Sequence, residues 1–205
     1  MASSEEITTL TFTPDNPCNT VVTSSAGKVL YRVTTDAAAK SPVTHVYDGA
    51  DELVASLEWH SVSADKVILK GQPPVSFTDW MKKSHIPFKD EASFKDAQGR
   101  KYKWKGIGPG RCMELHSEDD SFKTVIARYT RSYRMPNPAG DDPLVIHTPG
   151  ELKLTPRAAE VQELVVLTLL FQEKRRRLEA GGLSEGAGYG LAYGSAVGGA
   201  FGGLA

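Results

Sequence analysis

The segment ELVVLTLLFQEKRRR, residues 163–177, constrains the fold more than any other part of the sequence. Thr155 can cap a helix, Pro156 suits the first helical position, and no further proline or glycine occurs before Gly181. Because each helical residue turns the chain by about 100°, the apolar side chains of this segment reach all around the axis. The sequence therefore predicts a helix over about 156–180 that is apolar on every side.

A helix of this kind has to be surrounded by other parts of the protein. Its apolar stretch is shorter than the roughly 20 residues that cross a bilayer, and Glu160, Glu163 and Glu173 bracket it. An eight-stranded barrel is filled by its own side chains, so a helix about 10 Å across needs more strands around it. The β-rich residues before position 150 are the available covering.

Short β-branched and aromatic runs, interrupted by Gly, Pro, Asp and Asn, dominate residues 7–148. In ELVASLEWH, for example, the apolar residues alternate, and alternate side chains of a strand point to opposite faces. The near-regular spacing of these runs favours a barrel or sandwich over alternating β-α units. The predicted strands are 7–12, 19–22, 28–35, 43–48, 52–60, 66–70, 100–105, 112–117, 124–131 and 144–148, with weaker candidates at 74–80 and 92–96.

Together these signals predict a mainly β fold, a closed or nearly closed antiparallel barrel of about ten to twelve strands that encloses the hydrophobic C-terminal helix. Residues 1–6 are expected to be a flexible N-terminus, 7–180 a single barrel domain and 181–205 a Gly-rich flexible tail. The glycines of the tail recur every fourth residue, which is also the small-xxx-small pattern of packed membrane helices. A membrane or oligomerisation role for the tail therefore stays open.

The formal net charge of −1 gives no reason to expect nucleic acid or a membrane as partner, but the charge is unevenly distributed. Residues 82–134 hold 13 basic and 7 acidic side chains, a net of +6, and form a candidate basic surface. The N-terminus has neither a cationic start nor an apolar core, so it is not typical of a secretory signal. Cys18 and Cys112 are then expected to be reduced thiols in the cytosol or nucleus.

Two groups of cations are candidate lipid- or anion-binding residues. Strand alternation places the first group on one face, either as a lipid-binding surface or as a merely solvated one: Lys101, Lys103 and Lys105, with Arg128 on another strand. The second group follows the apolar helix: Lys174, Arg175, Arg176 and Arg177. It has three interpretations: a helix end exposed outside the barrel mouth that complements the helix dipole, an anionic-lipid site, or a nuclear localisation patch.

No residue pattern indicates catalysis, a metal site or a cofactor. GIGPGR, residues 106–111, has the glycines of a phosphate loop, but strands are predicted on both of its sides, which favours a hairpin loop. The five histidines lack the paired spacing of metal ligands, and no G-x-S-x-G elbow places a nucleophile. Glu58 and His60 share a strand face and are the best acid–base pair, although a solvated pair is the simpler interpretation.

The most distinctive segments of the chain are FTPDNPCNTVV (12–22), GKVLYRVTT (27–35), LVASLEWH (53–60), GRKYKWKG (99–106) and the closing ELVVLTLLFQEKRRR. They resemble an uncharacterised, mainly basidiomycete fungal family that is catalogued as a domain of unknown function, over about residues 8–179. That family is similar in kind to tubby C-terminal and LURP-one-related β-barrels, which enclose a hydrophobic C-terminal helix. The resemblance implies the same architecture and no catalytic residues, and tubby-type relatives bind phosphoinositides through surface cations.

We therefore expect a non-enzymatic, intracellular binding module that recognises an anionic lipid headgroup, such as a phosphoinositide, or a protein partner. No cofactor, metal, nucleic acid or transmembrane span is expected. The expected location is the cytoplasm, with membrane-peripheral or nuclear placement as alternatives. Two other functions stay open: a small-molecule-binding protein or enzyme with a pocket at the barrel mouth, and a structural protein that self-associates through its Gly-rich tail.

Overall fold

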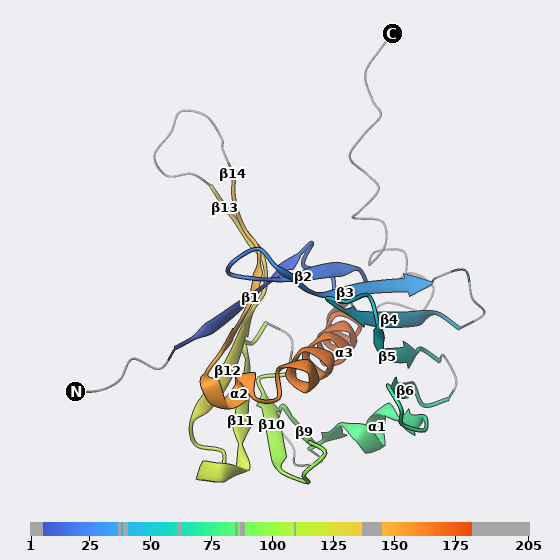
Figure 1. Cartoon of the computed structure of the whole chain (residues 1–205). Coiled ribbons are helices and arrows are strands. Elements are labelled where there is room, and N and C mark those ends of the chain that lie inside the picture. The colour runs from blue at the N-terminus through green and yellow to red at the C-terminus, as the bar shows by residue number, and fades with distance from the viewer. Residues whose placement is uncertain are drawn as a thin grey trace.

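The structure, a computed structural model, describes residues 6–36, 38, 41–60, 63–84, 86, 89–108, 110–136 and 145–181. The main element is one antiparallel sheet of thirteen strands, and a separate two-stranded ribbon projects from it (Figure 1). The ribbon consists of β13 (Tyr133–Pro136) and β14 (Val145–Thr148). The strands of the large sheet are β1 (Thr8–Thr13), β2 (Thr20–Ser24), β3 (Val29–Asp36), β4 (Val43–Asp48), β5 (Leu53–Glu58), β6 (Lys66–Leu69), β7 (Val75–Ser76), β8 (Lys82–Lys83), β9 (Glu91–Lys95), β10 (Lys101–Lys105), β11 (Met113–Ser117), β12 (Val125–Thr130) and β15 (Gly150–Leu154).

The large sheet consists of two meanders that a late strand joins. Strands β1 to β7 lie side by side in chain order on one half, and β8 to β12 do so on the other. β15 pairs with β1, where Leu152 lies opposite Leu10, and with β12, where Leu154 lies opposite Ala127. The last strand of the chain thus holds the two halves together and leads directly into the C-terminal helices.

The described residues also form three α-helices: α1 (Phe77–Trp80), α2 (Pro156–Ala159) and α3 (Gln162–Gly181). A 3-10 turn follows β11 at Glu118–Asp120. The single helix predicted over 156–180 is therefore divided in two. α2 packs against β12 and β15, whereas α3 passes along the concave side of the sheet, so the chain changes direction between them.

The sequence does not predict β13 or β15. The segment GELKL of β15 holds only two apolar residues and lies between Pro149 and Pro156, so its local pattern is that of a linker. Its strand conformation comes from pairing with a neighbour on each side, which is a tertiary effect. The weak strand candidate at 74–80 contains the two-residue strand β7 and the helix α1.

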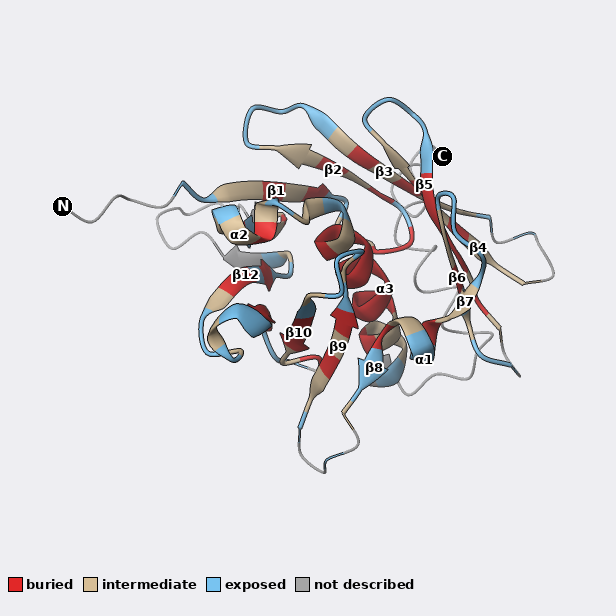
Figure 2. Ribbon diagram, turned by 60° about the horizontal axis from the view of Figure 1, so that its bottom comes forward, coloured by how far each residue is buried: buried red, intermediate tan, exposed pale blue. Residues whose placement is uncertain are grey.

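α3 forms the centre of the hydrophobic core on the concave side of the sheet (Figures 1 and 2). Every residue from 165 to 174 is buried, which confirms the prediction of a buried helix. Both halves of the sheet contact it. Trp104 of β10 donates its Nε1–H to Thr168 Oγ1 at 3.0 Å, and Gln162 Nε2 donates to the Tyr31 hydroxyl of β3 at 3.3 Å.

The sheet is not closed by hydrogen bonds. Its edge strands β7 and β8 have two residues each, and no ladder joins them within the described residues. Pro73 and Pro74 precede β7, and a proline cannot donate to a ladder, so pairing is limited there. The predicted closed barrel is therefore not confirmed: thirteen strands are present, yet the sheet stays open between β7 and β8, where α1 connects them.

Within the described part of the chain, no helix has the length and apolar character needed to cross a bilayer. The Gly-rich segment 182–205 that the sequence predicts to be a flexible tail lies outside the described residues, as do residues 1–5.

If α3 is the core of the fold, Leu167→Asp should unfold the protein, because Leu167 is 2% exposed and an unpaired charge would be buried there. We expect a loss of cooperative thermal unfolding in circular dichroism, corresponding to more than about 4 kcal/mol. The matched control is Leu53→Asp on β5, where the leucine is 44% exposed and the same change should cost little. A Leu167→Asp protein that melts near the wild type would contradict a core role for α3.

Candidate functional site

A cavity of about 420 Å³ lies between the two halves of the sheet, at the N-terminal end of α3. We call it the seam cavity, because residues from β5 and β6, from α1 between the edge strands, from the turn between β9 and β10 and from the start of α3 line it. It therefore lies on the side where the sheet is not closed.

The floor of the seam cavity is apolar. Within the described part of the chain, six partly buried apolar side chains pack around the core, and four of these six, Leu69, Trp80, Val161 and Leu164, line this cavity. Val54 and Leu167, which are buried, complete the floor. Since α3 is apolar on every side, the opening in the sheet leaves part of its first turns without a covering strand.

The rim of the seam cavity is polar, and most of its charges are compensated. Arg100 Nε lies 2.6 Å from Asp96 Oδ2, which also accepts a hydrogen bond from the Tyr102 hydroxyl at 3.1 Å. Burial would raise the pKa of Asp96, but these hydrogen bonds outweigh it and hold the pKa below its usual value. Lys70 forms an ion pair with Glu52.

Glu163 differs from the other rim carboxylates. It is exposed in the first turn of α3, and no ion pair to it occurs among the described residues. Burial of part of the group and the nearby carboxylate of Asp48 raise its pKa above the usual value, while Lys70 opposes them. The seam cavity is thus an apolar recess with one uncompensated carboxylate at its rim.

The opposite end of α3 carries a buried charge network that the sequence does not predict. Glu173 is the centre of this network, with a side chain that is 2% exposed. Its carboxylate oxygens lie 2.6 Å from Arg176 Nη2, 2.6 Å from Arg177 Nε and 3.1 Å from Arg131 Nε. Arg176 Nη1 also donates to the Arg111 carbonyl at 2.5 Å, so the loop before β11 covers this end of the helix.

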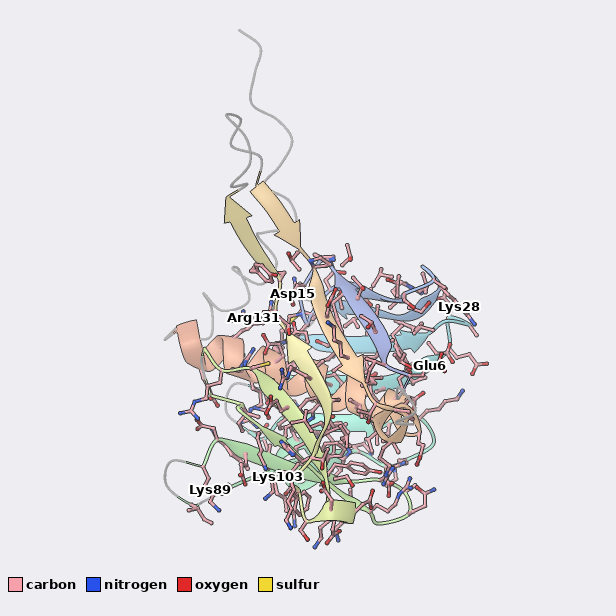
Figure 3. All side chains as sticks on the ribbon, turned by 90° about the vertical axis from the view of Figure 1, so that its left-hand side faces the viewer. Glu6, Asp15, Lys28, Lys89, Lys103 and Arg131 are labelled. Carbon is pink, nitrogen blue, oxygen red and sulfur yellow. The ribbon has the colours of Figure 1, made fainter. Side chains whose placement is uncertain are left out.

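Asp15 fixes the charge network to the start of the fold. Its carboxylate accepts hydrogen bonds from Arg177 Nη2, the Tyr129 hydroxyl and the Ser132 amide, each at 2.6 Å. A Cβ at Gly150 would lie 3.0 Å from the Asp15 Cγ, so the absence of a side chain there makes room for the carboxylate. Figure 3 shows Asp15 beside Arg131, at the base of the ribbon.

The pKa values of the network follow from these contacts. Burial would raise the pKa of Asp15, but Arg177 and the hydrogen bonds from Tyr129 and Ser132 hold it below the usual value. Burial, followed by the charges of Asp15 and Glu173, raises the pKa of the Tyr129 phenol well above its ordinary value. The Asp15 carboxylate is therefore ionised at neutral pH, and the Tyr129 phenol is a donor.

Lys174 is also buried, at 3% exposure. Its Nζ lies 3.5 Å from the centroid of the Trp59 ring, and Cys18 and Asp65 are close enough to affect its charge. Burial lowers the pKa of Lys174 to about 8, against the opposing effects of Cys18 and Asp65. Arg175 is partly exposed and lies with its Cζ 4.8 Å from the Phe77 ring centroid.

The prediction that the four cations after the helix are exposed is therefore wrong for Lys174 and Arg176, which are 3% and 2% exposed. Arg177 is 24% exposed and is held by Asp15 and Glu173. Buried cations that are paired with carboxylates, aromatic rings and carbonyls cannot form a lipid surface or a localisation patch without unfolding this end of the helix.

In a comparison with known protein families, residues 15–178 match the model of a family of unknown function, DUF6593. The chain belongs to the DUF6593 family. The matched region begins at Asp15 and includes Arg177, so the charge network and the residues of the seam cavity all lie within it. A comparison with curated proteins finds no match.

Among solved structures, the chain is similar to an X-ray structure of a protein from Arabidopsis thaliana. The two share 15% sequence identity, with a TM-score of 0.43. The similarity covers 80% of the DUF6593 chain and 90% of the plant chain.

The predicted lysine face of this DUF6593 chain is present, but acidic residues surround it. Lys101 lies 3.6 Å from Glu118 and Lys103 3.0 Å from Glu91, while Lys105 Nζ donates to the Phe122 carbonyl at 2.8 Å. Glu114 stands opposite both Lys105 and Arg128 in the strand register, and it pairs with Arg128 at 2.7 Å.

Lys103 lies well away from Asp15 and Arg131 (Figure 3). The structure therefore does not bring the lysine face and the cations after the helix together into one surface.

The remaining candidate residues of the DUF6593 chain lie outside the lining of the seam cavity. His60 Nε2 lies 3.4 Å from Glu58 Oε2, so the predicted pair exists, but neither residue lines the seam cavity. The strands on either side of GIGPGR, β10 and β11, pair antiparallel, as expected for a hairpin, and a Cβ at Gly106 would lie 2.1 Å from the Cys112 carbonyl oxygen. Within the ranges that the structure describes, no group of three potential metal ligands gathers.

Sequence reasoning misses Asp15, Tyr129 and Arg131. Asp15 lies 162 residues from Arg177 and 114 from Tyr129, and Tyr129 lies 48 residues from Arg177. One local signal exists: four consecutive cations after Glu173 outnumber the acidic residues near them, so distant carboxylates are needed if the turn is buried. The residues of the seam cavity give no local signal, because the cavity results from the unpaired edges β7 and β8.

If the charge network anchors α3, Asp15→Ala should destabilise this DUF6593 domain by about 3–5 kcal/mol, because it removes one of the two carboxylates that hold Arg177 and leaves the Tyr129 hydroxyl and the Ser132 amide without their acceptor. The measurement is the free energy of unfolding in urea. Glu52→Ala is the matched control, because Glu52 forms an exposed ion pair with Lys70 and its side chain is 61% exposed. That control should change stability by no more than about 1 kcal/mol. Equal effects of the two changes would show that the Asp15 contacts are not structural.

Proposed function

We propose that this protein is a non-enzymatic binding module that holds a small amphipathic molecule in the seam cavity. The observation that carries the proposal is the cavity of about 420 Å³ with an apolar floor and a polar rim. Ligand sites are typically recesses of roughly 300–1,000 Å³ lined by apolar side chains with a few polar groups that fix orientation. The apolar body of such a ligand would cover the exposed part of α3, and its polar group would remain at the rim of the cavity.

The arrangement of charges supports binding rather than catalysis. Asp96 and Glu160 are held by arginines, with Arg157 Nη1 3.0 Å from Glu160 Oε2, so these carboxylates are fixed as ion-pair partners. The acid–base pair of Glu58 and His60 does not line the cavity. The side chains of the seam cavity therefore supply shape, apolar surface and orientation.

Recognition of an anionic lipid headgroup is the alternative function, and it has less support. It would depend on Lys101, Lys103, Lys105 and Arg128, whose charges are offset by nearby carboxylates. Lys174 and Arg176 do not contribute, because they are buried. A barrel of the tubby type would favour this alternative, but the hydrogen-bonded sheet stays open between β7 and β8.

The seam cavity can be blocked without disturbing the core. Ala97 is exposed in the turn between β9 and β10 and lines the cavity, so Ala97→Trp should fill its mouth. Ser25 holds the same place in the turn between β2 and β3, away from the cavity, and both turns end in a glycine with positive φ, Gly99 and Gly27. Ser25→Trp is therefore a matched control.

We expect the neutral fluorescent probe N-phenyl-1-naphthylamine to bind the wild type and Ser25→Trp with equal, saturable affinity. Ala97→Trp should weaken binding by at least about tenfold, or about 1.4 kcal/mol. Equal binding by all three proteins would contradict the proposal. Salt-sensitive sedimentation with anionic vesicles, lost when Lys101, Lys103 and Lys105 are changed to Gln, would favour the lipid alternative.

A further inference from the structure

The balance of charge around the seam cavity indicates which polar group a ligand would carry. Among the ionisable side chains that line it, Lys70 is paired with Glu52, Asp96 with Arg100 and Glu160 with Arg157. Each of the three lining residues thus has a partner of opposite charge, and Arg157 is shared between Glu160 and Asp119.

Lys95 does not supply charge to the interior of the cavity. Its neighbour Phe94 is buried and stacks on Tyr102 with ring centroids 5.4 Å apart, so it points to the concave side. Successive side chains of a strand point to opposite faces, and the exposed Lys95 therefore points to the convex side. There it stands opposite Lys101 in the strand register.

Glu163 then remains as the rim charge without an ion pair among the residues that the structure describes. The nearest charges that affect it are Asp48, which repels it, and Lys70, which is already paired with Glu52. Burial and this repulsion raise the pKa of Glu163, as expected for a carboxylate whose ionised form lacks a cation. A cationic group of a ligand, bound at the rim, would supply this missing opposite charge.

The aromatic side chain of the floor favours the same kind of ligand. Trp80 lines the cavity and packs against Phe77 and Phe171, with ring centroids 6.2 and 6.0 Å away. Aromatic rings attract organic cations, and indole does so most strongly. A carboxylate at the rim and an indole in an apolar floor are complementary to a molecule with an apolar body and a positive end.

We infer that the seam cavity selects an organic cation, a small molecule with an apolar body and a protonated amine, and that Glu163 is the counter-ion that recognises the amine. This inference rests on the proposed function and adds the chemical class of the ligand. Trp80 and the apolar side chains of α3 contact the body of the molecule, and the rim carboxylate sets its orientation.

The test compares three probes that share a naphthalene body: 1-naphthylmethylamine, 1-naphthylmethanol and 1-naphthoate. Titration calorimetry at neutral pH and low salt should show the amine binding about five- to tenfold more tightly than the alcohol, and the carboxylate most weakly. Glu163→Gln should remove the preference for the amine, while the affinity for the alcohol stays within about twofold, because the neutral alcohol forms no ion pair with the rim carboxylate. Added salt should weaken the binding of the amine and of neither other probe.

Glu179→Gln is the matched control, since Glu179 is an exposed carboxylate at the other end of α3 and pairs with Lys83 at 3.7 Å. It should keep the preference for the amine. Binding of the alcohol with no preference for the amine, or a preference that survives Glu163→Gln, would overturn the inference and leave the proposed function standing. Failure of all three probes to bind would overturn both.

Discussion

Burying a helix that is apolar on every side is the constraint on which the rest of this structure depends. α3 runs along the concave face of the sheet, and strands from both halves contact it through Tyr31 and Trp104. β15 joins the two halves and feeds the chain into the helices, so the final part of the sequence both completes the sheet and fills it. At the C-terminal end of the helix, Asp15 and the loops around it cover Glu173, Arg176 and Arg177.

The same constraint explains the candidate site. The edge strands β7 and β8 are short and unpaired with each other, so the covering of α3 is incomplete on that side. Trp80 of α1 closes part of the gap, and the remaining space is the seam cavity, with its floor on the first turns of the helix. At its C-terminal end α3 is therefore part of the core, and at its N-terminal end it forms the surface that a ligand would cover.

Much of the fold can be predicted from local pattern. Alternation in β5 and β10 identifies their inward side chains, and the uninterrupted run after Pro156 identifies the helix.

The buried charge network could not be predicted in this way. A helix of 20 residues is about 30 Å long and a six-residue strand about 20 Å, so a charged turn after the apolar run is expected to project from the sheet. Loops cover that turn instead, and their contribution, including Asp15, is visible only in three dimensions. The partners of the lysine face, Glu91, Glu114 and Glu118, come likewise from neighbouring elements.

The central claim is that the charged turn of α3 belongs to the core and is not an exposed helix end. Native-state hydrogen exchange of the backbone amides tests it most directly, because core amides exchange only through global unfolding. The account predicts that the amides of residues 173–177 exchange with a free energy within about 1 kcal/mol of that for residues 165–171 and for β12. Rapid exchange of 173–177 while 165–171 and the strands remain protected would show an exposed, fraying end, and would contradict the account.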